Sequence, residues 1–400
     1  MKIVIVSLYL SNPAFAAQQS EKKLKLIVMP FFSRHFQIHK DKEFFSGMAL
    51  GIYLPGHSIK TYYKGTVSRD KGAASIDRNS LFEVGSITKS FTAVKMLQIM
   101  ASSVNNLSLD SKLGSYFPEY SHWRNLSIRQ LLNMTSGLPN YTSSPAINFY
   151  IEKNKPHRFS SKELINSVTS SAKVYPPMTS EFFYTNTGYI LASMIIEKVG
   201  NKPFNEQLVY DILKPLQLND TFYPVPSAEQ MPEVKKRLVD SYPYKIYLYP
   251  KLVGKKGQKG ELSWVGAAGG VVSNPEQIIK WVKEIFIENK VVSQEQLKLM
   301  TQLVSLNSGK PITKVSESDS AGYGLGLAQF YSKDVKNITW AYQGVTAGSR
   351  AVYLYTPCNG IILAVTVNSS PDEENNSIME FISGLNKKLV EAYPQFQCKK

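Results

Sequence analysis

Strand patterns occur at both ends of this 400-residue chain, and helical patterns fill its middle. Near the N-terminus, "GMALGIYLPGHSIKTYYKGTVS" (residues 47–68) predicts two strands joined by a Pro-Gly turn. Near the C-terminus, "GYGLGLAQF", "ITWAYQG", "SRAVYLYTP" and "GIILAVTVNSS" predict successive antiparallel strands. We therefore expect an α+β fold, in which one antiparallel sheet is built from both chain ends, is flanked by helices and carries a mostly helical insertion.

The middle of the chain, at about residues 105–262, has helical patterns joined by long loops. The segments with helical spacing are "SIRQLLNM", "SSKELINSV", "TGYILASMIIEKVG" and "FNEQLVYDILKPL". Gly200 and Asn201 follow the third segment as a helix C-cap would. We expect one domain over residues 17–400, with an α/β part at about 24–104 and 263–395 and a helical part at about 105–262. A cleft between two such parts is a common position for a site.

Two helices are predicted in the C-terminal part of the chain. A glycine-rich step, "GAAGGVV", leads to "SNPEQIIKWVKEIF", where Ser273 and Glu276 fit a capping box and Pro275 fits the first helical turn. The last helix is expected from about residue 375 to residue 393, where the pattern is amphipathic.

The first residues, "MKIVIVSLYLSNPAFAAQQ", have the three parts of a secretory signal peptide. Lys2 gives a positive start, residues 3–10 form a short apolar core, and Ala14-Phe15-Ala16 fits a cleavage site. The alternative is a buried first strand, against which Pro13 weighs. We therefore predict a signal peptide over residues 1–16 and a periplasmic or secreted bacterial protein. The next segment has helical spacing, and Pro30 predicts a break or a late start there.

The net charge of +15 raises the question of nucleic-acid binding. The basic residues are mostly scattered lysines, and no nucleic-acid-binding motif accompanies them, so a solvated lysine surface is the better interpretation. Only two cysteines occur, Cys358 and Cys398. In an oxidising compartment they could pair, and two unpaired thiols are an equal alternative. Without Cys/His clusters they do not predict a zinc site.

Several catalytic classes are excluded because their motifs are absent. The chain has no G-x-S-x-G, H-E-x-x-H, P-loop or helix-opening G-x-G-x-x-G motif, and its five histidines lie near no strong motif. Ser-x-x-Lys occurs four times, at Ser20/Lys23, Ser68/Lys71, Ser86/Lys89 and Ser170/Lys173. Because a bare match is weak evidence, the context of each pair has to decide.

Of these serines, only Ser86 follows a glycine at the start of an apolar helix. There the backbone N–H groups and the helix dipole can stabilise an oxyanion. Lys89, three residues on, lies on the same helical face and can reach the Ser86 hydroxyl. A desolvated lysine has a lowered pKa and can relay a proton. The alternative is that Ser86 only caps the helix and Lys89 extends to the surface.

A second candidate group is Tyr184 and Asn186, in "SEFFYTNTGYILASMIIEKVG". Both residues are expected in a loop just before an apolar helix. A tyrosine near a lysine ammonium loses its proton more easily and can act as a base, and an asparagine can bind a substrate amide. Taken alone, Tyr-x-Asn is a turn with a structural tyrosine.

Six segments occur in the order expected of one protein family: "FEVGSITKSFTA", "SIRQLLNMTSGLPNY", "FFYTNTGYILASMIIEKVGNKPF", "ILKPLQLNDTFYP", "AAGGVVSNPEQIIKW" and "GYGLGLAQF". Over about residues 44–368 the chain resembles the serine β-lactamase and penicillin-binding-protein-like hydrolases, the group around class C β-lactamases, D-alanyl-D-alanine carboxypeptidases and related esterases. The resemblance implies an acyl-enzyme mechanism with Ser86 as nucleophile. Lys89 and Tyr184 would share proton transfer, Asn186 would orient the substrate, and neither a metal nor an organic cofactor is needed.

The family's third motif, Lys-Thr-Gly or His-x-Gly, aligns with Tyr342, Gln343 and Gly344, which we expect to contact substrate. The backbone N–H of Val345 would then complete an oxyanion hole with that of Ser86. The tyrosine removes a cation that would bind a substrate carboxylate, an interaction of about 1.5–3 kcal/mol. Arg350 could restore a positive charge in the substrate site, or it could be a solvent-facing strand residue.

The sequence thus predicts an exported serine hydrolase that acts through an acyl-serine on an ester, a D-amino-acid peptide or a β-lactam carbonyl. The alternative is a catalytically weak penicillin-binding or scaffold protein that retains the fold. The expected partner is a small-molecule or peptide substrate, such as one derived from peptidoglycan, with no nucleic acid and no membrane span in the mature chain. The loops at residues 142–160 and 242–263 are expected to wall the cleft.

Overall fold

The computed structural model of the chain describes residues 13–102, 106–153, 157–169, 181–224, 231–245 and 250–398. Most of the predicted signal peptide, residues 1–12, lies outside these ranges. Its predicted cleavage site falls in the first turn of helix α2 (Pro13–His39), so the signal peptide stays a prediction.

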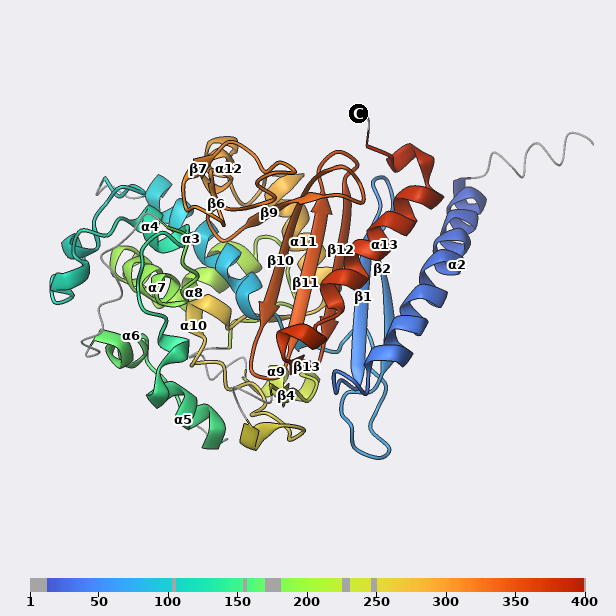
Figure 1. Cartoon of the computed structure of the whole chain (residues 1–400), viewed down its shortest axis with the longest axis horizontal. Coiled ribbons are helices and arrows are strands. Elements are labelled where there is room, and N and C mark those ends of the chain that lie inside the picture. The colour runs from blue at the N-terminus through green and yellow to red at the C-terminus, as the bar shows by residue number, and fades with distance from the viewer. Residues whose placement is uncertain are drawn as a thin grey trace, which may run out of the picture.

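A nine-stranded antiparallel sheet forms the centre of the fold, with the strand order β2-β1-β12-β11-β10-β9-β8-β6-β7. Its strands are β1 (Gly47–Tyr53), β2 (Lys60–Gly65), β6 (Leu303–Ser305), β7 (Pro311–Ile312), β8 (Ala321–Tyr323), β9 (Ala328–Ser332), β10 (Asn337–Val345), β11 (Arg350–Thr356) and β12 (Ile361–Val367). Because β1 pairs with β12, strands from the two chain ends are neighbours, as predicted (Figure 1). The α+β fold class is confirmed.

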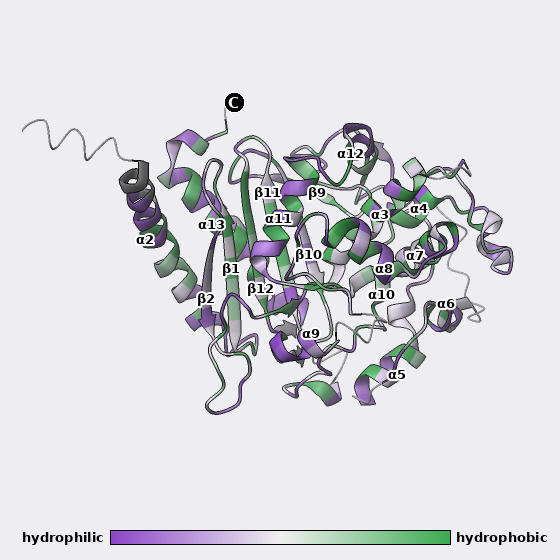
Figure 2. Cartoon of the chain, turned by 180° about the vertical axis from the view of Figure 1, so that it is seen from behind, coloured by the Kyte–Doolittle hydropathy of each residue, from purple (hydrophilic) through white to green (hydrophobic). Residues whose placement is uncertain are grey.

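Every residue of β11 and β12 is buried, because both faces of the sheet are covered. On one face, helix α13 (Ile378–Ala392) packs on these two strands and α2 lies beside it (Figure 1). On the other face, helix α11 (Pro275–Phe286) contacts β12 and β1. Figure 2 shows the consequence: β12 is mostly apolar, whereas polar and apolar residues alternate along α2.

The helical insertion lies beyond β10 and contains most of the remaining helices (Figure 1). In chain order, the helices between α2 and α11 are α3 (Thr88–Ser102), α4 (Ile128–Leu132), α5 (Pro145–Lys153), α6 (Ser161–Thr169), α7 (Thr187–Gly200), α8 (Phe204–Leu208), α9 (Met231–Arg237) and α10 (Gly266–Gly269). Helix α12 (Gln294–Met300) follows α11. Asn201 ends α7 in the left-handed conformation, as predicted. The boundaries proposed at about residues 105 and 262 remain a prediction.

Two small strand pairs were missed by the sequence patterns because they contain only two or three residues each. Strand β3 (Phe82–Glu83) pairs with β5 (Val272–Ser273), and β4 (Tyr242–Tyr244) pairs with β13 (Ser369–Pro371). Both pairs join the helical insertion or its edges to the main sheet.

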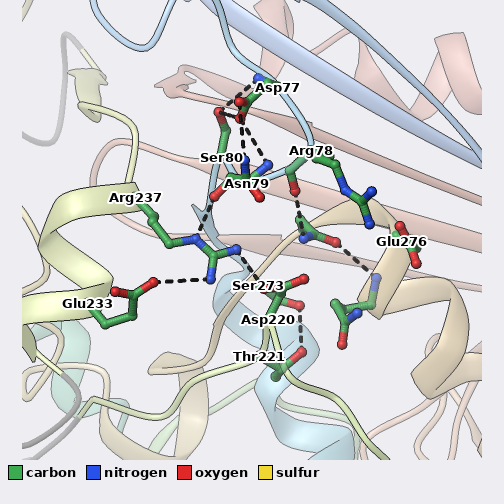
Figure 3. Close-up of polar contacts among 12 residues, drawn as sticks. Asp77, Arg78, Asn79, Ser80, Asp220, Thr221, Glu233, Arg237, Ser273 and Glu276 are labelled. Carbon is green, nitrogen blue, oxygen red and sulfur yellow. Dashed lines mark hydrogen bonds and ion pairs between the residues drawn. The ribbon is translucent and has the colours of Figure 1, made fainter.

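A polar network supports the β3–β5 pair (Figure 3). Arg237 at the end of α9 donates from Nε to Asn79 O at 2.8 Å and from Nη2 to Asp220 Oδ1 at 2.7 Å. Thr221 and Ser273 share a hydroxyl hydrogen bond of 2.9 Å. The network therefore connects α9, the turn before β3 and the strand β5.

Three local predictions were wrong. The cap of α11 is Asn274, whose side chain accepts from Gln277 N, so Ser273 and Glu276 form no capping box. Helix α2 continues through Pro30, because Pro30 is exposed while a stripe of residues at every fourth position packs on the core: Leu24, Val28, Phe32 and Phe36. "GYGLGLAQF" forms two strands, β8 and β9, because Gly326 adopts a φ of +69° in a turn between them.

The two cysteines form a disulfide, Cys358–Cys398, which ties the turn between β11 and β12 to the segment after α13. The alternative of two free thiols is therefore not the one the structure adopts. Within the described ranges, no helix is both long and apolar enough to cross a membrane.

Candidate active site

Ser86 lies in a single 3-10 turn, η1 (Gly85–Ile87), directly before α3. Gly85 has a φ of +50°, a conformation that glycine adopts without strain. The turn is followed by an apolar helix that is buried over most of its length. Lys89, which lies about one helical turn after Ser86, is 0% exposed. The alternative in which Lys89 extends to the surface is therefore wrong.

The Lys89 ammonium contacts three oxygen atoms. Nζ donates to Asn186 Oδ1 at 2.7 Å and to the Ala268 carbonyl at 2.8 Å, and it lies 2.9 Å from Ser86 Oγ. The amide oxygen and the carbonyl can only accept, so each uses one N–H of Lys89. The third position of the nitrogen therefore faces Ser86, as an N–H when Lys89 is charged and as a lone pair when it is neutral.

Asn186 is held with its oxygen toward Lys89. Its Nδ2 donates to Thr142 Oγ1 at 3.1 Å, and its backbone N–H donates to Asn140 Oδ1 at 3.1 Å. These contacts fix which side of the amide faces the ammonium, because only the oxygen can accept from it. Asn186 also precedes the first residue of α7, which contacts both α3 and α10.

Tyr184 approaches Ser86 from the other side, with its hydroxyl 2.7 Å from Ser86 Oγ. Burial of the phenol group favours its neutral form, but the charge of Lys89 and hydrogen bonds with Lys89, Ser86 and Tyr342 outweigh this effect, so the pKa of Tyr184 is lowered. Tyr184 as a whole residue is 38% exposed, although its hydroxyl group is buried against Ser86.

Desolvation lowers the pKa of Lys89, and the nearby Tyr184 partly opposes this change. Both pKa values are therefore lowered, so each group gives up its proton more readily than an ordinary lysine or tyrosine does. A deprotonated Lys89 or Tyr184 beside Ser86 can accept the hydroxyl proton.

The C-terminal end of β10 lies against the serine turn. A Cβ atom on Gly85 would come within 2.5 Å of Val345 N, and one on Gly344 would overlap Val84 O. Two glycines thus permit a backbone approach that side chains would block. This approach brings the backbone nitrogens of Ser86 and Val345 close to each other's chain segments, and the oxyanion hole stays a prediction. Gln343, between Tyr342 and Gly344, is half-buried.

Tyr342 is buried beside Tyr184 and shares a hydrogen bond of 2.7 Å with the hydroxyl of Tyr323. Burial and the neighbouring phenols raise the pKa of Tyr342. Tyr342 is therefore a neutral donor, and the hydrogen bond that it makes with Tyr184 favours the ionised form of the latter.

The prediction that Arg350 supplies a cation to the substrate site was wrong. Its side chain is 1% exposed and forms an ion pair of 2.7 Å with Glu43, which is also 1% exposed. The guanidinium further donates to Ser369 O and to Asn376 Oδ1, both at 2.8 Å. Arg350 therefore connects β11 to the segments around α2 and α13. It is not the solvent-facing residue of the alternative either.

Sequence analysis missed two members of the site. The Ala268 carbonyl, which accepts from Lys89, belongs to the glycine-rich step, a segment of the family resemblance to which no role in the site was given. Tyr323, which binds Tyr342, lies in "GYGLGLAQF", another of these segments that was given no role in the site. Within the described ranges, no group of three or more His, Cys, Asp or Glu side chains could hold a metal ion.

Comparison with known proteins gives one family match: the family model described as Beta-lactamase matches residues 32–381. Penicillin-binding protein 4* of Bacillus subtilis (strain 168) is 26% identical over 238 residues, which cover 58% of this chain and 51% of that protein. The chain thus matches about half the length of this curated relative.

Two solved structures show the likeness in fold. A crystal structure of D-amino acid amidase from Ochrobactrum anthropi SV3, complexed with L-phenylalanine amide, is 23% identical with a TM-score of 0.71 and covers 93% of this chain and 97% of that chain. The octameric penicillin-binding protein homologue from Pyrococcus abyssi is 21% identical with a TM-score of 0.73 and covers 93% of this chain and 79% of that chain.

Proposed function

Because this chain belongs to the Beta-lactamase family, whose model matches residues 32–381, we propose that it is a hydrolase that forms an acyl-serine intermediate on Ser86. One observation carries the proposal: Ser86 Oγ lies between two proton-transfer groups, Lys89 Nζ at 2.9 Å and Tyr184 Oη at 2.7 Å. A serine next to a positioned base is the arrangement that nucleophilic catalysis requires.

In the acylation step, Ser86 transfers its hydroxyl proton to the Tyr184 phenolate, and Oγ forms a bond to the substrate carbonyl carbon. The charged Lys89 stabilises the phenolate before the transfer. The carbonyl oxygen becomes an oxyanion, which the N–H groups of Ser86 and Val345 bind. As the bond to the leaving group breaks, Tyr184 returns the proton to that group.

Water completes the reaction by the same route. It attacks the acyl carbon, Tyr184 takes its proton, and the proton returns to Ser86 Oγ as the ester bond breaks and the acid leaves. Asn186 orients Lys89 and is also available to the amide of a substrate. The acyl group leaves as the acid, and the enzyme returns to its initial state.

The proposed substrate is an ester or an amide of a D-amino acid or peptide rather than a β-lactam. Tyr342 supports this choice, because a neutral phenol stands where a lysine or histidine of the family would bind a substrate carboxylate. The structural likeness to a D-amino acid amidase gives secondary support for amides. We further propose export to the periplasm or the medium, where peptides derived from peptidoglycan would be available.

Intact-protein mass spectrometry tests the proposal. We expect a fluorophosphonate probe to add one adduct to the protein, and the Ser86→Ala variant to show none. A fluorescent penicillin should react much more slowly than the phosphonate. Equal labelling by both probes would restore the β-lactam substrate, and unchanged phosphonate labelling of Ser86→Ala would remove Ser86 from the site. No adduct with either probe would favour the catalytically weak scaffold protein.

A further inference from the structure

A cavity that is not lined by Ser86, Lys89 or Tyr184 lies between the two segments that were predicted to form the walls of the cleft, residues 142–160 and 242–263. Its volume is about 50 Å³, several times the ~10–15 Å³ that one water molecule needs. The lining includes Tyr150, His157 and Phe159 from the first segment, Glu261 from the second, Trp264 directly after it, and Glu83 from β3.

The chain brings this cavity close to Ser86 at three points. Glu83 precedes Ser86 by three residues, and Ala347, also in the lining, follows Val345 by two. Two residues of chain span at most ~7 Å. Trp264 lies four residues before Ala268, whose carbonyl binds Lys89. The cavity wall therefore lies within a few residues of chain of the N–H groups of Ser86 and Val345.

Glu83 places a buried carboxyl group in the cavity wall. The residue is 5% exposed, and its Oε2 accepts from Thr346 Oγ1 at 2.5 Å. In the described part of the chain, no Lys, Arg or His pairs with this carboxyl, and Thr346 is its only side-chain partner. Burial raises the pKa of Glu83 to about 7, although the hydrogen bond from Thr346 opposes this rise. A buried carboxylate without a cation is unfavourable, and a ligand cation would relieve this.

The rest of the lining also favours a cation. Glu261 supplies a second carboxyl group, which accepts from Ser263 N at 3.1 Å. The rings of Tyr150, His157 and Phe159 form a packed aromatic group in the lining, with centroid distances from His157 of 4.4 and 4.3 Å. Among the described lining residues there is no Lys or Arg, although the whole chain has a net charge of +15. If charges were placed at random, a chain with this net charge would have more basic than acidic residues in such a lining.

We propose that this cavity is a subsite for a primary ammonium group on the acyl side of the substrate, with Glu83 as its counter-ion. The inference rests on the proposed function and narrows it to esters or amides whose acyl group carries a side-chain amine several bonds from the carbonyl, as in lysine. Glu83 acts on the ammonium group and does not touch the reacting atoms, so its effect is on specificity.

The test compares two substrates that differ only in the terminal ammonium group of the side chain, the p-nitrophenyl esters of Nα-acetyl-lysine and Nα-acetyl-norleucine, each in its D and L forms. We expect the wild-type protein to hydrolyse the preferred lysine ester with a kcat/KM at least tenfold above that of the norleucine ester. Glu83→Gln should reduce this ratio to near one and change the norleucine ester less than threefold. The matched control Glu197→Gln, a glutamate outside this cavity, should keep the ratio.

A Thr346→Val variant separates charge from structure, because it removes the hydrogen bond and keeps the carboxylate. If Glu83 only holds Thr346, both variants will slow both esters alike and leave the ratio unchanged, which overturns the proposal. A wild-type ratio near one also overturns it. Should Glu83→Gln fail to fold, Glu261→Gln replaces it, and a ratio equal to the wild-type ratio then counts against the subsite.

Failure of the proposed function is recognised separately with p-nitrophenyl acetate, which has no side chain. Ser86-dependent hydrolysis of this ester together with a flat lysine/norleucine ratio overturns the subsite alone. No Ser86-dependent hydrolysis of any ester overturns the function, and the subsite is then tested by calorimetric titration of the whole protein with n-butylammonium chloride. Binding that Glu83→Gln abolishes supports the subsite, and the absence of binding to the wild-type protein overturns it.

Discussion

Replacing Arg350 by methionine separates a structural role from a role in substrate binding. Methionine retains much of the apolar volume and removes the guanidinium. Glu43 would then stay buried at 1% exposure without its arginine partner, and it would keep only its hydrogen bonds from Ser377 and the contact of 3.0 Å between its Oε1 and His39 Nδ1. Removal of one partner from a buried ion pair destabilises proteins by about 3–5 kcal/mol, because the other charge is left without compensation.

The magnitude converts to a measurable temperature shift. At about 2.1 cal/mol/K per residue, the unfolding entropy of a 400-residue chain is about 0.8 kcal/mol/K. We therefore expect Arg350→Met to lower Tm by about 4–6 °C in differential scanning calorimetry. Adding Glu43→Gln should recover part of the lost Tm, because the buried carboxylate that has lost its arginine partner is then replaced by a neutral amide.

The activity assay supplies the refutation. With p-nitrophenyl acetate and the Nα-acetyl amino-acid esters, Arg350→Met should retain kcat/KM within about threefold of the wild-type value at a temperature where both are folded. A tenfold loss of kcat/KM with an unchanged Tm would show that Arg350 contacts substrate, and the structural role argued from its contacts would be wrong.

Four further changes have defined outcomes. Tyr184→Phe removes the hydroxyl beside Ser86 and should lower kcat/KM for p-nitrophenyl acetate by ~10²–10⁴-fold, measured by absorbance, while Tm stays nearly constant. Tyr342→Lys should raise penicillin acylation relative to ester turnover by roughly tenfold or more, and an unchanged ratio would contradict our alignment of the third motif. The pKa of Glu83 is raised from 4.5 to about 7, so the folded state binds this proton more tightly than the unfolded state does. As pH rises from 4.5 to 8, the free energy of unfolding of the wild-type protein should therefore fall by about 3 kcal/mol relative to that of Glu83→Gln, measured by urea titration. A difference between the two proteins that does not change with pH would refute the shift. Cys398→Ser opens a disulfide with a sequence separation of 40 and should destabilise the protein by about 4 kcal/mol, and a reducing agent should lower the wild-type Tm to that of the variant.

Alternation and residue type predicted the central sheet, because strands leave a periodic pattern. The grouping of Ser86, Lys89, Tyr184 and Asn186 came from the family resemblance, since the residues alone left a surface position for Lys89 and a structural turn for Tyr184 as alternatives. Short strands such as β7, with two residues, leave no periodic pattern. They form because longer neighbouring strands offer them hydrogen-bonding partners.

Arg350 and Ala268 show why the remainder of the site could not be predicted. Arg350 begins β11, a strand that is buried on both faces, so alternation along the strand does not indicate which face meets the cleft. Ala268 acts through its backbone carbonyl, which every residue type possesses, and the residue name therefore carries no information about it. Both roles depend on segments distant in the sequence, here Glu43 and Lys89.

The pairing of β1 with β12 also sets the order of events during synthesis. Ile52 pairs with Leu363, so the ribosome must add about 300 residues before the first hairpin meets its neighbour. At ~5–20 residues per second this takes roughly 15–60 s, during which β1 presents an unpaired edge. Until then β1 has a hydrogen-bonded neighbour on one side only, the strand β2. A protein cut short before β12 would carry every side chain of the Ser86 group and lack the strand that joins β1 to β11.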